Sequence, residues 1–177
     1  APVQIVVFSD FQCPGCADVS MLLEQAAANY STAISIVFKH FPLSTKCNDG
    51  VHSDMHESAC DAAYAAQAAH LQNKFWPFHD ALFEANLEDP ADALFTLRRI
   101  ASGVGLDIRR FEADMSSPET KLRVRQDAVI AAELRVRGTP AVYLNGKVIH
   151  RLTPGLLQAI IESEIQRSSG RTVMGGR

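Results

Sequence analysis

A CxxC pair placed between a strand and a helix is the feature that most constrains this sequence. Residues 3–8, VQIVVF, are almost continuously apolar and rich in β-formers, as in a strand covered on both faces. Cys13 and Cys16 follow at once, separated by Pro14 and Gly15. Proline is favoured in the first turn of a helix, where its missing N–H costs nothing. We therefore expect a buried strand that leads through the cysteines directly into a helix.

The rest of the chain predicts two further β-rich regions on either side of a helical stretch. Apolar residues at helical spacing follow the cysteines, and residues 33–41 predict a second strand. A long Ala-rich stretch without breakers then predicts a helix capped by Ser53 or Asp54, and more helical segments follow. Near the end, Asn145-Gly146 between two short β-rich runs is a strong hairpin signal before a last amphipathic helix.

This order of elements predicts an α/β protein with a thioredoxin-like fold and a helical insertion between its βαβ and ββα halves. We expect a single domain over residues 1–166, with the insertion at about residues 53–137. Residues 167–177 are small, polar and glycine-rich, which predicts a disordered tail.

Composition and charge exclude several classes of protein. The 177 residues carry a formal net charge of −3, so nothing favours nucleic acid as a partner. No apolar run reaches the roughly 18 residues that a membrane-spanning helix needs. The sequence opens on a predicted strand rather than a signal peptide, as expected of a mature exported protein, an excised domain or a cytosolic protein. Four cysteines are too few for a disulfide scaffold, and their even number suggests paired redox use.

The position of the CxxC favours redox chemistry over a metal site. A structural zinc ion needs four ligands, and no second CxxC or His pair stands near Cys13 and Cys16. At a helix N-terminus, unpaired N–H groups and the helix dipole lower the pKa of a thiol. We expect Cys13 to be the reactive thiolate, and Cys16 to point inward and attack the mixed disulfide that Cys13 forms. The alternatives for Cys13 and Cys16 are zinc binding and an inert structural disulfide.

A Thr-Pro pair before the hairpin supplies a second candidate part of this site. The residue before a proline is held in an extended conformation, so Thr139 and Pro140 could simply form a loop that leaves a helix. Beside a CxxC, we instead expect a cis Thr139–Pro140 bond that faces the cysteines. Thr139 would then offer its backbone N–H and C=O to an extended substrate chain.

The combined motifs resemble the DsbA-like thiol–disulfide oxidoreductases of the thioredoxin superfamily. The resemblance spans about residues 3–166 and rests on VVFSDFQCPGC, FKHFPL, AAYAAQAA…KFWPFHDALF and VRGTPAVYLNG. It implies disulfide formation in reduced exported proteins, a periplasmic or other extracytoplasmic location, and reoxidation by a membrane quinone-linked thiol oxidase. The stretch from FKHFPL through KFWPFHDALF, with two extra cysteines, is also similar to domains fused to bacterial vitamin K epoxide reductase homologues, which suggests a reoxidant of that type.

Two positions depart from the pattern of that family. Many relatives carry a buried Glu six residues before the first cysteine, where this chain has Val7. An internal proton acceptor for Cys16 is therefore missing, and water or Lys39 and its neighbours would have to serve. The dipeptide ends in Gly15, where the strongest oxidants have a His that stabilises the thiolate, so we expect a less acidic Cys13 than theirs.

Cys47 and Cys60 form a second pair with more than one interpretation. A structural disulfide between them would close a loop of about 14 residues and contribute roughly 3 kcal/mol. Alternatively, His52 and His56 between them complete four zinc-type ligands, which would make a non-enzymatic metal-binding module. A redox-active role is a third possibility. We expect the disulfide and no metal, because an oxidising compartment and the resemblance both favour the bond.

The function that we expect is a monomeric enzyme without a cofactor that oxidises dithiols in exported proteins. A disulfide isomerase or reductase is the nearest alternative, and the metal-binding module is the alternative from another class. Other polar residues near the site are expected to have ordinary roles, Asp10 as a solvated loop acid and His40 as a surface residue. The aromatic residues of the helical stretch are expected in the core.

Overall fold

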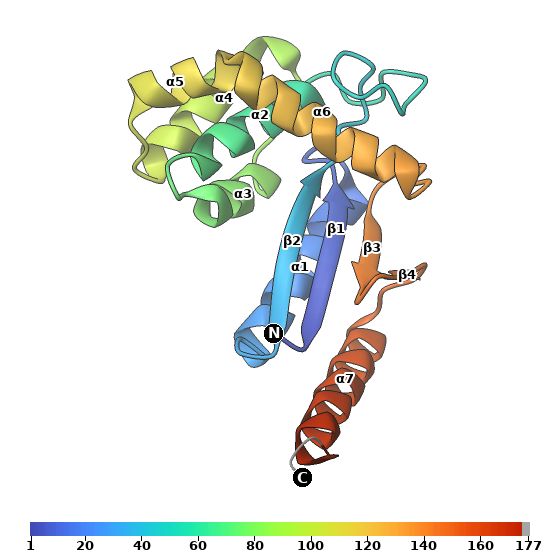
Figure 1. The fold of residues 1–177 in the computed structure, drawn as a ribbon. Coiled ribbons are helices and arrows are strands. Elements are labelled where there is room, and N and C mark those ends of the chain that lie inside the picture. Colours follow the sequence, from blue (N-terminus) through green and yellow to red (C-terminus); the bar gives the residue numbers. More distant parts are fainter. Residues whose placement is uncertain (175–177) are drawn as a thin grey trace.

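The computed structural model describes the backbone of residues 1–174 and the side chains of residues 1–168. Its elements are β1 (Val3–Ser9), α1 (Pro14–Asn29), β2 (Ile34–His40), α2 (Ala59–His70), α3 (Phe75–Phe83), α4 (Pro90–Gly103), α5 (Ile108–Ser116), α6 (Pro118–Glu133), β3 (Ala141–Leu144), β4 (Lys147–Ile149) and α7 (Pro154–Met174). This is the predicted thioredoxin-like α/β fold, with helices α2 to α6 inserted between the βαβ and ββα units (Figure 1).

A mixed sheet in the order β2-β1-β3-β4 forms the centre of the fold. β1 runs parallel to β2 and antiparallel to β3, so that Val7 lies between Phe38 and Val142. Asn145 and Gly146 both have positive φ and form the turn between β3 and β4, as their sequence predicts. Because β1 is paired on both sides, the CxxC that follows it is anchored to the most constrained strand of the sheet.

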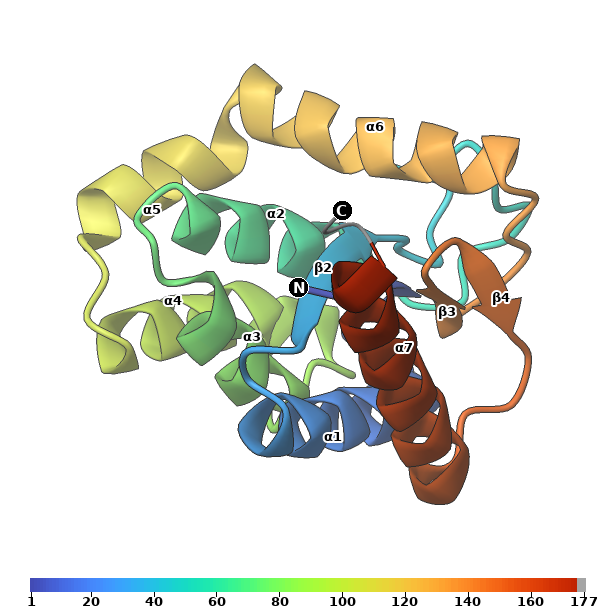
Figure 2. The same ribbon diagram turned by 60° about the horizontal axis from the view of Figure 1, so that its bottom comes forward.

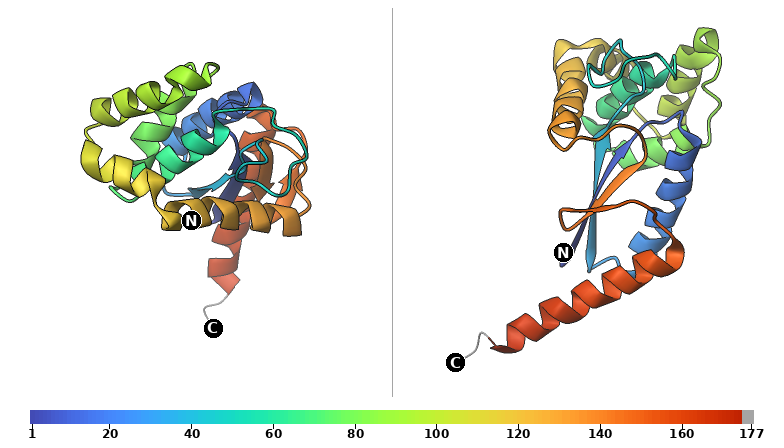
Figure 3. Two further views of the ribbon diagram at one scale, coloured as in Figure 1. Left: turned by 90° about the horizontal axis from the view of Figure 1, so that it is seen from above. Right: turned by 90° about the vertical axis from the view of Figure 1, so that its right-hand side faces the viewer.

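Alternation of side chains along β1 separates two apolar clusters. Val3, Ile5 and Val7 point to the face that α1 and α7 cover. Phe8 points to the opposite face, where it packs with Ala131 of α6. α6 leaves the inserted helices and returns to the sheet, while α7 reaches past the ends of the strands (Figures 2 and 3). No helix in the described part of the chain combines the length and apolarity of a membrane span.

Helix α2 is the centre of the insertion, and its buried face is made almost entirely of alanine. Short side chains allow the neighbouring helices to approach closely, and larger residues such as Phe78, Leu97 and Phe111 fill the space between them. Phe11, from the segment between β1 and α1, belongs to the same cluster. The insertion therefore packs directly on the segment that carries the cysteines.

The insertion begins later than the sequence predicts. Asp54 does not cap α2, because its carboxylate accepts hydrogen bonds from Ser44 Oγ at 2.8 Å and from the Thr45 N–H at 2.7 Å. These bonds tie Asp54 to the loop after β2 rather than to a helix, and α2 begins only at Ala59, with Ser58 at its N-cap. The helical stretch then ends with α6 at Glu133.

The C-terminal tail also differs from its prediction. The sequence predicts disorder over residues 167–177, but α7 continues to Met174, so residues 167–174 are helical. Serine and glycine each cost at most about 1 kcal/mol in a helix relative to alanine, and an existing helix needs no new nucleus to extend. Residues 175–177 of the predicted tail lie outside the described residues.

Cys47 and Cys60 form a disulfide that ties the loop after β2 to α2. We expect their replacement by alanine to lower the free energy of unfolding by about 3 kcal/mol, because the unfolded chain then loses a loop constraint. The slope of that free energy against urea should rise, since the open chain exposes more surface. The protein with the Cys47–Cys60 bond and the alanine variant without it are best compared with Cys13 and Cys16 changed to serine in both, which prevents thiol exchange. Equal urea midpoints and slopes would contradict a stabilising role for the bond.

Candidate active site

The CxxC lies at the N-terminus of α1. Cys13 is the N-cap residue, with φ −85° and ψ 117°, and Pro14 occupies the first helical position. The N–H of Cys16 donates to the C=O of Cys13 at 3.0 Å, which closes the first turn. Both cysteines are free thiols, and Cys13 is half-buried whereas Cys16 is 1% exposed. A protein substrate can therefore approach the sulfur of Cys13 more readily than that of Cys16.

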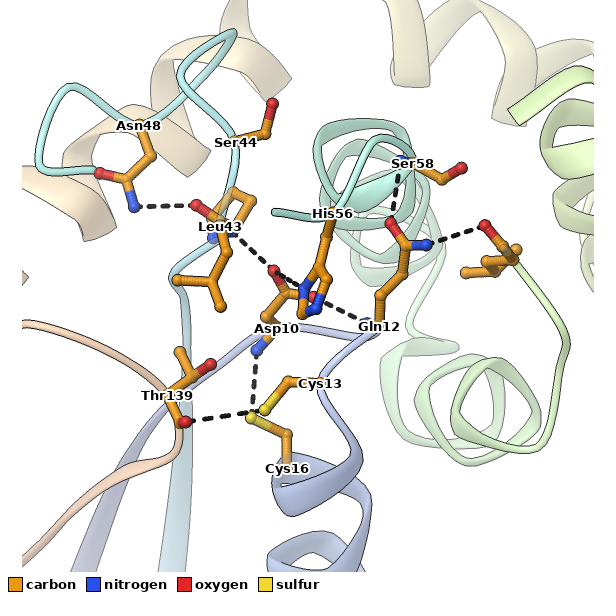
Figure 4. Close-up of polar contacts among 12 residues, drawn as sticks. Asp10, Gln12, Cys13, Cys16, Leu43, Ser44, Asn48, His56, Ser58 and Thr139 are labelled. Carbon is orange, nitrogen blue, oxygen red and sulfur yellow. Dashed lines mark hydrogen bonds and ion pairs between the residues drawn. The ribbon is translucent and has the colours of Figure 1, made fainter. Parts of the chain in front are cut away.

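The segment before β3 lies beside the cysteines (Figure 4). The Thr139–Pro140 peptide bond is cis. When protonated, the Cys13 thiol donates to the C=O of Thr139, with 3.6 Å between sulfur and oxygen. A Cβ added to Gly15 would lie 3.3 Å from Cδ of Pro140, so the proline ring packs against the dipeptide between the cysteines. The fold thus brings Cys13, Cys16, Thr139 and Pro140 into one site.

The two thiols have opposite acidities. The pKa of Cys13 is lowered to about 5, mainly by a hydrogen bond from the Cys16 thiol and further by the Thr139 side chain and the Cys16 N–H. Partial burial and the negative charge of Asp10 act against this lowering of the pKa. The pKa of Cys16 is raised because its proton is shared with the Cys13 sulfur and because it is buried. At neutral pH, Cys13 is therefore a thiolate and Cys16 a thiol.

Asp10 is a buried structural acid beside the cysteines, so its expected role as a solvated loop acid is wrong. It is only 2% exposed, because the loop after β2 folds back over it. Its carboxylate accepts hydrogen bonds from the N–H groups of Leu43 at 2.6 Å and Gln12 at 2.7 Å, and its own N–H donates to Cys16 Sγ at 3.5 Å (Figure 4). His56 Nδ1 lies 3.0 Å from Oδ2 of Asp10, without the alignment of a hydrogen bond.

Gln12 is a second residue that sequence analysis missed. Its Nε2 donates to the C=O of Leu87 at 2.8 Å, and its Oε1 accepts from the Ser58 N–H at 2.8 Å. Gln12 directly precedes Cys13, so these two bonds tie the segment that carries Cys13 to the start of α2 and to the connection between α3 and α4. The Asp10-x-Gln12 spacing suits a local turn, which is the one signal of this network in the sequence.

Lys39 and His40 are consecutive in β2, so their side chains point to opposite faces of the sheet. Lys39 Nζ pairs with Asp127 of α6 at 2.7 Å, and the other oxygen of Asp127 accepts the His40 N–H at 3.1 Å. The His40 ring is buried beside Phe38 and Phe75, and this burial lowers the pKa of its imidazole to about 4, so its expected surface role is wrong. Side chains alternate along a strand, and Phe38 points to the side of Cys16. Lys39 is therefore not placed to accept the proton of Cys16.

The second cysteine pair does not present a zinc site. Both sulfurs are consumed in the disulfide, which leaves no thiolate to bind a metal. His56, the proposed third ligand, lies against Asp10 instead. Among the side chains of residues 1–168, no cluster of three or more His, Cys, Asp or Glu is arranged to hold a metal ion.

Two hollows border the cysteines. A groove of about 760 Å³ opens beside Cys13, with walls that include Phe11, Met55, Phe83 and Leu87. Three carboxylates also line it, those of Glu57, Glu84 and Glu88. A separate cavity of about 270 Å³ reaches Cys16 between α1, the sheet and α3. Access to the two sulfurs therefore comes from different directions.

The acidity of Cys13 predicts how the reduced protein responds to pH. We expect thiolate absorbance with a midpoint near pH 5. Because the folded pKa lies below the unfolded one, this group stabilises the reduced protein fully at high pH, and the stabilisation is lost as pH falls toward 5. The reduction potential should change by about 59 mV per pH unit below that midpoint and by about 30 mV above it, as the protons bound on reduction fall from two to one. A single slope through pH 5 would contradict the lowered pKa.

The chain matches the family model described as a DSBA-like thioredoxin domain over residues 4–159. A probable disulfide bond formation protein D of Bacillus anthracis is 30% identical, across 90% of this chain and 73% of its own length. The solved structure of a thioredoxin-like oxidoreductase from Silicibacter pomeroyi has a TM-score of 0.73 and 26% identity, covering 95% of this chain and 87% of that chain.

Some relatives are much longer proteins. The Na(+)/H(+) antiporter NhaA 3 of Salinispora tropica is 32% identical over 97% of this chain, but the match covers only 25% of the antiporter. The chain spans about a quarter of the length of the antiporters that it matches, so the similarity covers only part of each antiporter. By its fold and its sequence, the chain belongs to the family of DsbA-like thioredoxin domains.

Proposed function

We propose that this protein introduces disulfide bonds into exported proteins through Cys13-Pro14-Gly15-Cys16. The observation that carries the proposal is the opposite acidity of the two sulfurs, one a half-buried thiolate and the other a buried thiol. Stabilisation of the Cys13 thiolate favours the reduced enzyme, which makes the Cys13–Cys16 disulfide a stronger oxidant.

The reaction proceeds through a mixed disulfide at Cys13. A substrate thiolate attacks Cys13 Sγ, the Cys13–Cys16 bond breaks, and Cys16 leaves and takes up a proton. A second substrate thiolate then attacks the substrate sulfur of the mixed disulfide and releases Cys13 as a thiolate. The substrate loses two electrons and forms one disulfide, and the enzyme holds both electrons as a dithiol. The low pKa of Cys13 makes it a good leaving group in the second step.

The surroundings of Cys13 suit an unfolded protein segment as substrate. Thr139 lies within hydrogen-bond reach of Cys13, and we propose that its backbone pairs with an extended substrate chain. The groove beside Cys13 combines apolar walls with carboxylates, so it can hold apolar and polar side chains next to the reacting cysteine. These features support a role for Thr139 and Pro140 in substrate binding.

The cellular setting follows from the same proposal. A dithiol oxidase needs an oxidising compartment, and we propose a periplasmic or other extracytoplasmic location. The two electrons must then pass to a membrane thiol oxidase linked to a quinone. The resemblance to domains fused to vitamin K epoxide reductase homologues makes an oxidase of that type the first partner to test.

The two cysteines should differ when each is replaced. We expect Cys16→Ala protein to accumulate mixed disulfides with reduced substrates, because the sulfur that releases a trapped partner is gone. Cys13→Ala protein should show neither trapping nor oxidation of a reduced unfolded protein, because Cys16 is buried. Non-reducing electrophoresis with mass spectrometry compares the pair. Equal trapping by both variants would contradict the assigned roles.

The reduction potential separates an oxidase from the alternative reductase. Strong oxidants of this kind lie near −120 mV and thioredoxin near −270 mV, and a Cys13 pKa of about 5 falls between their acidities. We therefore expect about −140 to −220 mV in a glutathione titration at pH 7. Scrambled disulfide substrates provide the control for isomerase activity. A potential close to that of thioredoxin would favour the reductase instead.

A further inference from the structure

Cys16 forms part of the wall of the cavity of about 270 Å³ between α1, the sheet and α3. Most of this wall is apolar, with Val7 contributed by β1 and Ile36 and Phe38 contributed by β2. The polar side chains that line it are those of Ser9, Cys16, Ser20, Glu24, His79 and Asp80. The buried thiol therefore shares one cavity with a histidine and two carboxylates from α1 and α3.

His79 is the buried titratable group of this cavity that the disulfide chemistry has not used. Its side chain is 5% exposed, and Nδ1 lies 2.8 Å from Oδ1 of Asp80. Since an ionised carboxylate only accepts hydrogen bonds, Nδ1 carries the proton and Nε2 keeps the lone pair. Among the described side chains, none forms a hydrogen bond with Nε2.

Aromatic rings hold His79 in place. Its ring packs edge-on against Phe38, Trp76 and Phe83, with centroids 4.9 to 5.2 Å apart. Burial lowers the pKa of the imidazole, so His79 is neutral at pH 7. A fixed neutral imidazole with an unpaired nitrogen in a cavity wall is a proton acceptor for water in that cavity.

Cys16 needs such an acceptor. Each time the reduced pair is reoxidised, Cys16 must lose its proton before it attacks the mixed disulfide at Cys13. Val7 provides no carboxylate beneath the site, and Lys39 pairs with Asp127 on the opposite face of the sheet. The carboxylate of Asp10 is turned toward Leu43, Gln12 and His56. Glu24 and Asp80 also line the cavity, but both are exposed residues, which leaves His79 as the buried base on the cavity side of Cys16.

We propose that His79 accepts the proton of Cys16 through water in this cavity and returns it when the enzyme disulfide is next attacked. The inference rests on the proposed thiol chemistry of Cys13 and Cys16. The proton passes from Cys16 S–H to water and from water to Nε2, while no electrons move. Asp80 is half exposed and stabilises the imidazolium, and from this edge of the cavity the proton exchanges with solvent. Asp80 is thus a positioning residue for His79.

The test follows the single step that depends on Cys16. Oxidised glutathione reacts with the Cys13 thiolate to form a mixed disulfide, and Cys16 then expels glutathione. Rapid mixing and acid quenching between pH 5 and 9 give the two rates separately. We expect His79→Gln to slow the second step about tenfold at pH 7 and steepen its rise with pH, within the range of general-base effects. Added imidazole should restore part of the rate. The first step should be unchanged.

His40→Gln is the matched control, because His40 is equally buried but does not line this cavity. It should retain the wild-type rate of the second step. Asp80→Asn is a second variant for the case in which His79→Gln does not fold, because a substitution at the exposed Asp80 disturbs packing less. Asp80→Asn should slow the second step and alter the pH profile of its rate. Wild-type rates and pH profiles in the folded variants would overturn the inference. Absence of any mixed disulfide in Cys16→Ala protein, which cannot expel glutathione, would instead overturn the proposed function and, with it, the inference.

Discussion

The hydrogen bond from the Cys16 thiol to the Cys13 sulfur is the interaction on which the chemistry of this protein depends. It lowers the pKa of one thiol by raising that of the other, so a single contact gives the proposed nucleophile and the proposed resolving thiol opposite acidities. The contact exists because α1 places the two sulfurs one turn apart on the same side of its first turn. β1, paired on both sides, fixes where that turn begins.

Much of the remaining structure holds the segment between β1 and α1. Phe11 belongs to the apolar cluster of the inserted helices, Asp10 binds the loop after β2, and Gln12 binds both α2 and the α3–α4 connection. The Cys47–Cys60 disulfide closes that same loop onto α2. The insertion therefore supports the site as well as bordering the groove beside Cys13. A buried polar network of this kind is costly when one partner is lost, because the others remain desolvated.

Val7 places an apolar side chain in the strand that leads to the cysteines. An apolar side chain there keeps the sheet packed against α1, but it leaves the buried thiol without a carboxylate. The cavity on the same side brings Ser9, His79 and Asp80 to Cys16 from other elements. The proposed proton transfer at Cys16 and the proposed substrate binding at Cys13 would then use different hollows, the cavity and the groove.

The sequence alone determined what depends on local order along the chain. The strand before Cys13, the helix begun by Pro14 and the turn at Asn145-Gly146 follow from short-range preferences, so the fold class and the place of Cys13 and Cys16 at a helix N-terminus could be predicted. Tertiary structure decided what depends on distant partners. Asp10 and His40 are polar residues near strand ends and look solvated in the sequence, yet the loop after β2 covers Asp10 and Phe75 of α3 packs on His40. Segments far away in the chain set the burial of both residues. The same holds for His79 and Cys16, which line one cavity, because packing rather than local propensity fixes which side chains share a cavity.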